Sequence, residues 1–385
     1  MKFNLGIIAT MIKAIIGMLL CFTAAVYAET NPPTYGHSTT INVENRCIVQ
    51  FIDDLHHEQV PGLAKGVAKR VNANVQHIYK HTIKGMTINR PCHAVQAKLS
   101  AHDLIVKITP DGVVSAAKGK PKDKSNSKGQ EQPWNVDRVG GSQDGTGMTA
   151  WVIDSGIDLD HPDLNVDSAR GFTVIYAGKR LSMNDANGHG THVAGTIAAI
   201  NNELNVIGVA AGATVVPVRV LDRQGNGTWS GFLAGIDHVA ANAGAGDCVN
   251  MSLSGGGYSL VDDAVKAAAS KTGAYFVSAA GNQNVSATTR SPARANGPGV
   301  YTISAIDADD NLASWSNYGN PPIDFSAPGV NILSLYKGGG TATMSGTSMA
   351  APAACAVLML SNGNPSTDGV SGNDPDGNPD PIITL

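Results

Sequence analysis

Beyond residue 130 the sequence alternates short apolar runs with helical patterns, and this alternation constrains the fold more than any other feature. The expected strands are residues 149–153, 214–220, 248–253, 275–279 and 300–305. The expected helices between them are residues 191–201, 230–241 and 260–270. Strands that are apolar throughout are buried on both faces, so the pattern predicts an α/β fold, a parallel sheet with helices on both faces. Ligands of such sheets bind at the carboxyl ends of the strands.

A candidate nucleophile lies in the stretch GTSMAAP, residues 346–352. An expected strand (331–336) and a glycine-rich turn precede it, and an apolar helical run (349–360) follows. This places Ser348 at the mouth of a helix, where backbone N–H groups lack intrahelical partners and the helix dipole is positive. A hydroxyl there is able to attack a carbonyl while nearby N–H groups bind the oxyanion. The alternative is a serine that only caps a core helix.

Three further stretches supply the groups that such a nucleophile needs. Asp154 ends an apolar strand in VIDSG, His189 begins a helix in NGHGTHVAGT, and Asn282 follows Gly281 in a turn after another strand. Serine-based acyl transfer requires a base for the hydroxyl proton, an acid that fixes the imidazole tautomer, and donors for the oxyanion. The four stretches together therefore predict acyl transfer.

In the order Asp, His, Asn, Ser, these stretches resemble the signature of the subtilases, the subtilisin-like and proteinase K-like serine proteases, over about residues 131–360. The resemblance implies an endopeptidase that works through an acyl-enzyme. Asp154 would orient the imidazole, His189 would be the general base, Ser348 the nucleophile and Asn282 the oxyanion donor. After Pro352 the sequence departs from the family's usual His-Val-Ala-Gly run, which bears on the packing behind Ser348.

The resemblance also implies how substrate binds. Two strands would clamp an extended peptide through main-chain hydrogen bonds. Their residues are Gly225 and Gly227 on one side, and Ser252, Leu253, Ser254 and Gly255 on the other. The first specificity pocket would be lined by Ala279, Ala280 and Gly281. Since no carboxylate occurs in that stretch, we expect broad or apolar specificity; for the glycines, turn geometry alone is the alternative. His192 is expected to be a packed structural histidine.

One or two structural calcium sites, and no organic cofactor, follow from the same resemblance. The stretch at residues 200–209 resembles a calcium loop, whose ligands would be Gln132, Asp163, Ile200, Asn202, Leu204 and Val206. A second cation site would use Pro298, Val300 and Asp324. Ligation by oxygen alone suits this hard cation. A plain polar turn is the alternative for the first site.

The first 28 residues resemble an export signal. Lys2 and Lys13 flank the start of an apolar core at residues 14–26, and small residues precede a cut after Ala28. A membrane anchor is the alternative, although the apolar run is short for a bilayer span of ~20 residues. We therefore expect a secreted, extracellular or periplasmic protein that does not bind membranes once the signal is removed.

Residues 29–130 are expected to form a separate unit. They carry 14 Lys and Arg against 8 Asp and Glu, whereas residues 131–385 carry 11 against 23. Opposite charges suit an intramolecular pair, and the acidic sign of the larger part disfavours nucleic acid. The order β-α-β-β-α-β fits residues 46–115, which resemble an inhibitor-type propeptide. Residues 117–130 are polar, basic and without apolar periodicity, which predicts a linker open to proteolytic nicking, with self-cleavage near Gly129–Glu131. The product is expected to be a monomer that acts on proteins and peptides.

Four cysteines remain after the signal, and export permits disulfides. Among the three possible pairings we favour Cys47–Cys92 with Cys248–Cys355. Free buried cysteines explain the second pair equally well.

The polar tail, residues 361–385, is expected to add little to the core. Its DPDG stretch offers calcium ligands or is a plain acidic loop.

Three readings compete with the peptidase. The first is a non-catalytic binding relative. The second is a metallohydrolase that uses Asp154, Asp158, Asp160, Asp163 and His189, although no helix carries a metal-binding pair with an adjacent glutamate base. The third is a lipase-like hydrolase. Ser348 does not lie in the Gly-x-Ser-x-Gly turn that carries the nucleophile of such hydrolases.

Overall fold

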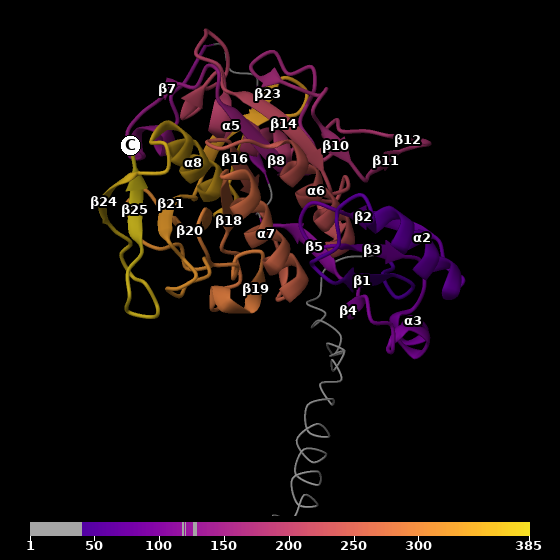
Figure 1. Cartoon of the computed structure of the whole chain (residues 1–385). Coiled ribbons are helices and arrows are strands. Elements are labelled where there is room, and N and C mark those ends of the chain that lie inside the picture. The colour runs from indigo at the N-terminus through magenta and orange to yellow at the C-terminus, as the bar shows by residue number, and fades with distance from the viewer. Residues whose placement is uncertain (1–40, 118, 120, 126–128) are drawn as a thin grey trace, which may run out of the picture.

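The computed structural model describes residues 41–117, 119, 121–125 and 129–385 (Figure 1). The predicted signal peptide lies outside these residues. The N-terminal unit, residues 47–110, comprises β1 (Cys47–Phe51), α2 (Val60–Arg70), β2 (Val75–Tyr79), β3 (Gly85–Ile88), α3 (Cys92–Leu99) and β4 (Ile105–Pro110). Its sheet is antiparallel, in the order β2-β3-β1-β4. The predicted β-α-β-β-α-β order is present, and the Cys47–Cys92 disulfide joins β1 to α3.

The remainder is built on one large sheet. Its strands, from edge to edge, are β10 (Phe172–Thr173), β14 (Thr214–Arg219), β8 (Thr149–Asp154), β16 (Cys248–Met251), β18 (Tyr275–Ala279), β20 (Val300–Ile306), β21 (Phe325–Pro328), β25 (Pro381–Thr384) and β24 (Ser366–Val370), with β9 (Asn165–Val166) also paired to β14. All of these neighbours are parallel except the hairpin of β24 and β25. The predicted parallel sheet is therefore confirmed.

Helices cover both faces of this sheet (Figure 1). On one face lie α5 (His189–Ala198) and α8 (Thr347–Leu360), and on the other α6 (Trp229–Asn242) and α7 (Ser259–Thr272). Side chains of β8 alternate between the two layers: Ala150 and Val152 join the core around α5 and α8, whereas Trp151 and Ile153 join the core around α6 and α7. This period of two is why the strand is apolar throughout. The Cys248–Cys355 disulfide links β16 to α8.

Shorter elements surround the sheet. They are β5 (Val113–Ala116), β6 (Lys122–Ser125), α4 (Trp134–Arg138), β7 (Gln143–Asp144), β11 (Tyr176–Ala177), β12 (Arg180–Leu181), β13 (Ala210–Ala211), β15 (Asn226–Thr228), β17 (Leu253–Gly256), η1 (Ala287–Thr289), β19 (Arg290–Ser291), β22 (Ile332–Tyr336) and β23 (Gly340–Met344). Within the described residues, no helix is both long and apolar enough to cross a membrane.

One sequence prediction about the irregular segments is wrong, and a second segment contains a strand that the sequence pattern did not indicate. The tail does contribute to the core, because β25 pairs with β21 and leaves Ile382 and Ile383 without exposure. A few apolar residues suffice there, since the neighbouring strand supplies the backbone partners. The basic linker is also partly ordered, because β6 pairs antiparallel with β23.

The N-terminal unit packs on the layer of α6 and α7 (Figure 1). Ile48, Tyr79 and Ile83 join the apolar core of that layer. Asp237 on α6 accepts hydrogen bonds from three successive backbone N–H groups, at residues 80–82, over 2.6–2.9 Å. Asp111, just after β4, accepts from the Ser230 N–H at 2.9 Å, where N–H groups at the start of α6 lack helical partners. The two units therefore interact through both apolar and charge-assisted contacts.

Candidate active site

Asp154 and His189 form a buried pair at the carboxyl edge of the sheet. Asp154 is the last residue of β8, His189 is the first of α5, and neither is exposed. His189 Nδ1 lies 2.8 and 2.9 Å from the two oxygens of Asp154. The Ser155 N–H donates to the same carboxylate at 2.6 Å. A carboxylate on Nδ1 fixes the tautomer that leaves Nε2 free to accept a proton.

Asp185 connects the segments that carry this pair. One of its oxygens accepts from Ser155 Oγ at 2.9 Å and from the Gly188 N–H at 2.8 Å. The other accepts from the Thr191 N–H at 3.0 Å and from Thr191 Oγ1 at 2.7 Å, inside the first turn of α5. Ser155 Oγ in turn accepts from the Gly190 N–H at 3.0 Å. Asp185 thereby joins the end of β8 to the start of α5.

Ser348 lies inside the first turn of α8, and its side chain is buried. Its hydroxyl donates to the Ser252 carbonyl at 2.9 Å. His189 Nε2 has no hydrogen-bond partner among the described residues. The serine–histidine hydrogen bond is therefore not made in this state, and a rotation of the Ser348 hydroxyl is needed to form it.

The Asn282 amide is oriented by the residue before the nucleophile. Its Oδ1 accepts from the Thr347 N–H at 2.9 Å and from Thr347 Oγ1 at 2.8 Å. Thr347 Oγ1 accepts from the Gly281 N–H at 3.0 Å. Because the amide oxygen is engaged by these donors, its Nδ2 group is the one left to donate to a substrate oxygen.

The predicted peptide clamp is filled by a segment of the chain itself. Strand β5 lies between β15 and β17, antiparallel to both. Val114 pairs with Gly227, and Ala116 pairs with Leu253. The Ala116 N–H donates to the Gly225 carbonyl at 2.9 Å. Both predicted sides of the clamp thus bind an extended strand, by addition of that strand to a sheet.

Ala117, the residue after β5, reaches the nucleophile. Its carbonyl accepts from the Ser348 N–H at 3.3 Å, and its own N–H donates to the Ser252 carbonyl at 3.4 Å. Its side chain belongs to the same buried cluster as Ala279. The Ala117 side chain is therefore buried in the same core layer as α8.

Two clamp glycines are required by close approach. A Cβ on Gly227 would lie 2.5 Å from the Val220 carbonyl oxygen, and one on Gly255 would lie 2.4 Å from the Trp229 ring.

His192 Nε2 lies 3.1 and 3.0 Å from the carbonyls of Ile332 and Ala342, as expected for a packed histidine.

The predicted calcium loop is only partly assembled as expected. The side-chain amide nitrogen of Gln130 lies 2.7 Å from the Ile200 carbonyl, 3.4 Å from the Val206 carbonyl and 3.5 Å from Asn202 Oδ1. Asn202 donates to Asp163 Oδ1 at 2.8 Å. Leu204 is on this loop, but among the described contacts its N–H, not its carbonyl, is engaged, with Asn202.

Asp163 is the carboxylate of this loop. Its Oδ2 is buried and has no partner among the described residues. Burial raises the pKa of Asp163 to about 6. Burial disfavours the charged form of this carboxylate even though Asn202 donates to its other oxygen, so a cation beside it would be favoured.

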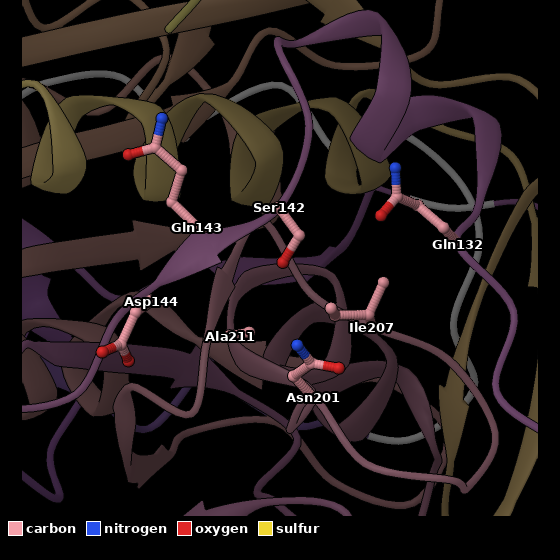
Figure 2. A pocket seen from close by; sticks show the side chains of 7 residues that line it. All are labelled: Gln132, Ser142, Gln143, Asp144, Asn201, Ile207 and Ala211. Carbon is pink, nitrogen blue, oxygen red and sulfur yellow. The ribbon is translucent and has the colours of Figure 1, made fainter.

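Gln132 is not among these oxygens, contrary to the sequence prediction. Its amide donates to Asp137, and its side chain lines a hollow of about 290 Å³ with Asn201 and Ile207 (Figure 2). The hollow lies outside the catalytic cleft, which β5 fills.

The second predicted cation site is less developed. Asp324 accepts from the Thr302 N–H at 2.9 Å, and burial raises its pKa to about 6. Within the described part of the chain, no cluster of three or more His, Cys, Asp or Glu side chains is able to hold a metal ion. The aspartate-rich metallohydrolase reading therefore has no support.

Comparison with known proteins identifies the family. Residues 145–371 match the model of the subtilase family, Peptidase S8. The chain belongs to the subtilase family. This subtilase is 36% identical over 297 residues to alkaline serine exoprotease A of Vibrio alginolyticus, an alignment that covers 74% of this chain and 53% of that protein. It is 33% identical over 300 residues to proteinase R of Parengyodontium album, covering 74% and 71%.

A solved structure is similar as well. A cold-adapted subtilisin-like serine proteinase is 34% identical, with a TM-score of 0.57, over 66% of this subtilase and 98% of that chain. The chain spans about half the length of the Vibrio protein and 62% of the length of subtilisin-like protease 5 of Arthroderma otae.

Sequence reasoning missed three residues of the site. Asp185 lies two residues before the histidine motif, and its contacts with Ser155 and Thr191 arise only on folding. Gln130 is two positions from the glutamine that was chosen. Ala117 was assigned to the linker, although two valines followed by Ser115, Ala116 and Ala117 are the kind of segment that an apolar-preferring clamp would bind.

Proposed function

We propose that this chain is the precursor of a secreted serine endopeptidase that cleaves peptide bonds through Ser348, His189 and Asp154. The observation that carries the proposal is the strand β5 in the clamp, with the Ala117 carbonyl on the Ser348 N–H. An acyl-transfer enzyme binds the carbonyl group of its substrate at that position, beside the backbone N–H of the nucleophile.

The buried groups support a defined role for each side chain. After the Ser348 hydroxyl rotates from Ser252 to His189, Nε2 takes its proton as the oxygen attacks the carbonyl carbon. Asp154, on Nδ1, stabilises the imidazolium that forms. The Ser348 N–H and the Asn282 amide stabilise the oxyanion. His189 then gives the proton to the leaving nitrogen, and water releases the acyl group by the reverse sequence.

We further propose that residues 29–130 are a self-inhibiting propeptide, preceded by the signal peptide, 1–28, and followed by the peptidase domain, 131–360, with the tail, 361–385. The filled clamp and the contacts of Asp111 and Asp237 support inhibition, because no substrate can enter while β5 is bound. Small apolar residues in the clamp and pocket support broad or apolar specificity. Two disulfides support export to an oxidising compartment.

The loop at residues 200–206 fits calcium. A buried carboxylate oxygen without a partner lies on this loop, and the carbonyls of Ile200 and Val206 and Oδ1 of Asn202 converge on the Gln130 amide. With the Gln130 amide turned so that its oxygen faces the ion, these groups would form an oxygen-only donor set. Asp163, Asn202, Ile200 and Val206 would hold the ion, with Gln130 in place of Gln132. The ion would stabilise the fold and take no part in the reaction.

The test is hydrolysis of casein by the processed protein. Wild type is expected to be active and Ser348→Ala inactive. Ser361→Ala, at the opposite end of α8, is the matched control and is expected to retain activity. A processed, folded wild type without activity would instead favour the non-catalytic binding relative.

A further inference from the structure

The position of Ala117 identifies which peptide bond lies over the nucleophile. The residue is tied on both sides, by its N–H to the Ser252 carbonyl and by its carbonyl to the Ser348 N–H. It is 5% exposed. The preceding residues are fixed as a strand by both clamp strands, so the carbonyl has little freedom to move away.

The chain stays bound beyond this bond. The Gly119 N–H donates to the Ser345 carbonyl at 2.9 Å, three residues before the nucleophile. Further along, β6 pairs with β23, with Lys122 opposite Thr343 and Ser125 opposite Thr341. The chain on both sides of the bond is therefore attached to the peptidase, as an uncut substrate would be.

The region near Gly129–Glu131, where the sequence suggests self-cleavage, is bound elsewhere. The Glu131 N–H donates to the Asn205 carbonyl at 2.9 Å, and the Ile207 N–H donates to the Glu131 carbonyl at 3.1 Å. The Gln130 side chain contacts the Ile200 carbonyl. All of these partners belong to the candidate calcium loop.

We propose that the first self-cleavage occurs at the peptide bond after Ala117, and that the basic segment from Lys118 to Gln130 remains on the peptidase as its N-terminal arm. The proposal rests on the proposed peptidase activity of Ser348. Cleavage near residues 129–131 then becomes a separate, later trimming step.

The chemistry of the step is ordinary hydrolysis. Ser348 Oγ bonds to the Ala117 carbonyl carbon while its proton moves to His189 Nε2. The bond from that carbon to the nitrogen of Lys118 breaks, and this nitrogen takes the proton. Water then attacks the ester, gives one proton to His189, which returns it to Ser348, and leaves Ala117 with a free carboxylate.

The arm is expected to survive the first cut because its own contacts do not depend on the broken bond. Strand β6 keeps its pairing with β23, and Glu131 keeps its backbone bonds to the 205–207 segment. The Gln130 amide is already at the candidate calcium loop in the uncut chain. We therefore expect the loop to be complete before cleavage, so that cutting and calcium binding are independent steps.

The experiment follows full-length chain by intact mass and N-terminal sequencing over time, at several dilutions that suppress cleavage between molecules. The expected first product begins at Lys118, appears at a rate independent of dilution, and is absent in Ser348→Ala. Ala117→Asp places a carboxylate at this buried, apolar position and is expected to slow this product at least tenfold. Ser115→Asp, an exposed position of the same strand, is the matched control and is expected to cut at the wild-type rate.

The outcomes separate the two proposals. A first product that begins at residues 130–132, with casein hydrolysis intact, overturns the Ala117 assignment and leaves the peptidase proposal standing. Equal slowing by Ala117→Asp and Ser115→Asp overturns it as well, since the slowing would then not depend on the buried position of residue 117. Identical processing of Ser348→Ala, with no casein hydrolysis by wild type, contradicts the peptidase proposal itself.

Discussion

Acid is expected to release the N-terminal unit from the peptidase, and His77 is the main sensor. His77 lies on β2, two residues before Tyr79, so both side chains point to the same side of the strand. Tyr79 donates to the Ser230 carbonyl on α6 at 3.0 Å, which shows that this side faces the peptidase. Burial, together with the positive charge of Arg46, lowers the pKa of His77 from 6.5 to about 4.

The size of the effect follows from linkage between protonation and binding. Above pH 6.5 His77 is neutral in both the bound and the free unit, so binding does not depend on its titration. As the pH falls from 6.5 toward 4, the free unit takes up a proton that the complex does not. If the whole difference between these two pKa values arose on binding, the complex would be weaker at pH 5 than at pH 8 by about 30-fold, or about 2 kcal/mol. Because Arg46 belongs to the same unit as His77, its share of the shift persists in the free unit, and this figure is an upper limit.

A second histidine acts in the same direction. Burial lowers the pKa of His81, and the neighbouring charges of Lys271, Lys80 and His57 lower it further, while Asp237 opposes them. Lys271 Nζ lies 3.1 Å from His81 Nδ1. His81 therefore adds to the loss of affinity in acid.

The assay measures the dissociation constant of the cleaved complex by biolayer interferometry between pH 8 and pH 5, so that the pH dependence of turnover does not enter. His77→Gln is expected to lose most of the dependence, and His93→Gln, an exposed histidine on α3, is expected to keep it. A wild-type constant that is unchanged at pH 5, or a full dependence in His77→Gln, would refute the reasoning.

Three further outcomes are expected. Asn282→Leu should lower kcat about 10²–10³-fold with little change in KM, which is the effect known for loss of the matching donor in subtilisin. Steady-state kinetics on a peptide substrate measure both constants, and an unchanged kcat would contradict the assigned role. Asp185→Asn should lower kcat by up to about 10²-fold. The donors that now face both carboxylate oxygens would lose one acceptor, and the positions of Asp154 and His189 would be held less firmly. A loss of thermal stability with normal kcat would refute this positioning role. Calcium should raise the Tm of wild type and of Gln132→Ala, and it should raise the Tm of Gln130→Ala much less. A calcium concentration of 100 times the Kd adds about 2.7 kcal/mol to the free energy of unfolding. Equal responses of the two variants would argue against Gln130 as a ligand.

The sheet and its catalytic motifs were predictable because each depends on a short contiguous stretch. The apolar run of β8 ends at Asp154, and the helical run of α8 begins beside Ser348. The spacing of apolar residues therefore predicts each element, and the motif residue lies at its end or its start. Cys248 and Cys355 lie 107 residues apart, and their pairing follows only from the way α8 crosses β16.

The missed features all depend on contacts between distant segments. Ala117 has no motif of its own, and its place follows from β5 adding to two strands more than 100 residues away in the sequence. The choice between Gln130 and Gln132 depends on which side chain folding brings to the Ile200 carbonyl, 70 residues from Gln130 in the sequence. The burial of Ile382 depends on the open edge of β21, which no local pattern reveals.

The most direct test of the central claim is the intact mass and peptide map of the processed protein after reaction with a serine-directed sulfonyl fluoride at saturating calcium. The account predicts one adduct for each chain, located on Ser348, with loss of casein hydrolysis in proportion to the modified fraction and no adduct in Ser348→Ala. Full hydrolysis by protein that carries the adduct on Ser348 would contradict the claim that this serine is the nucleophile.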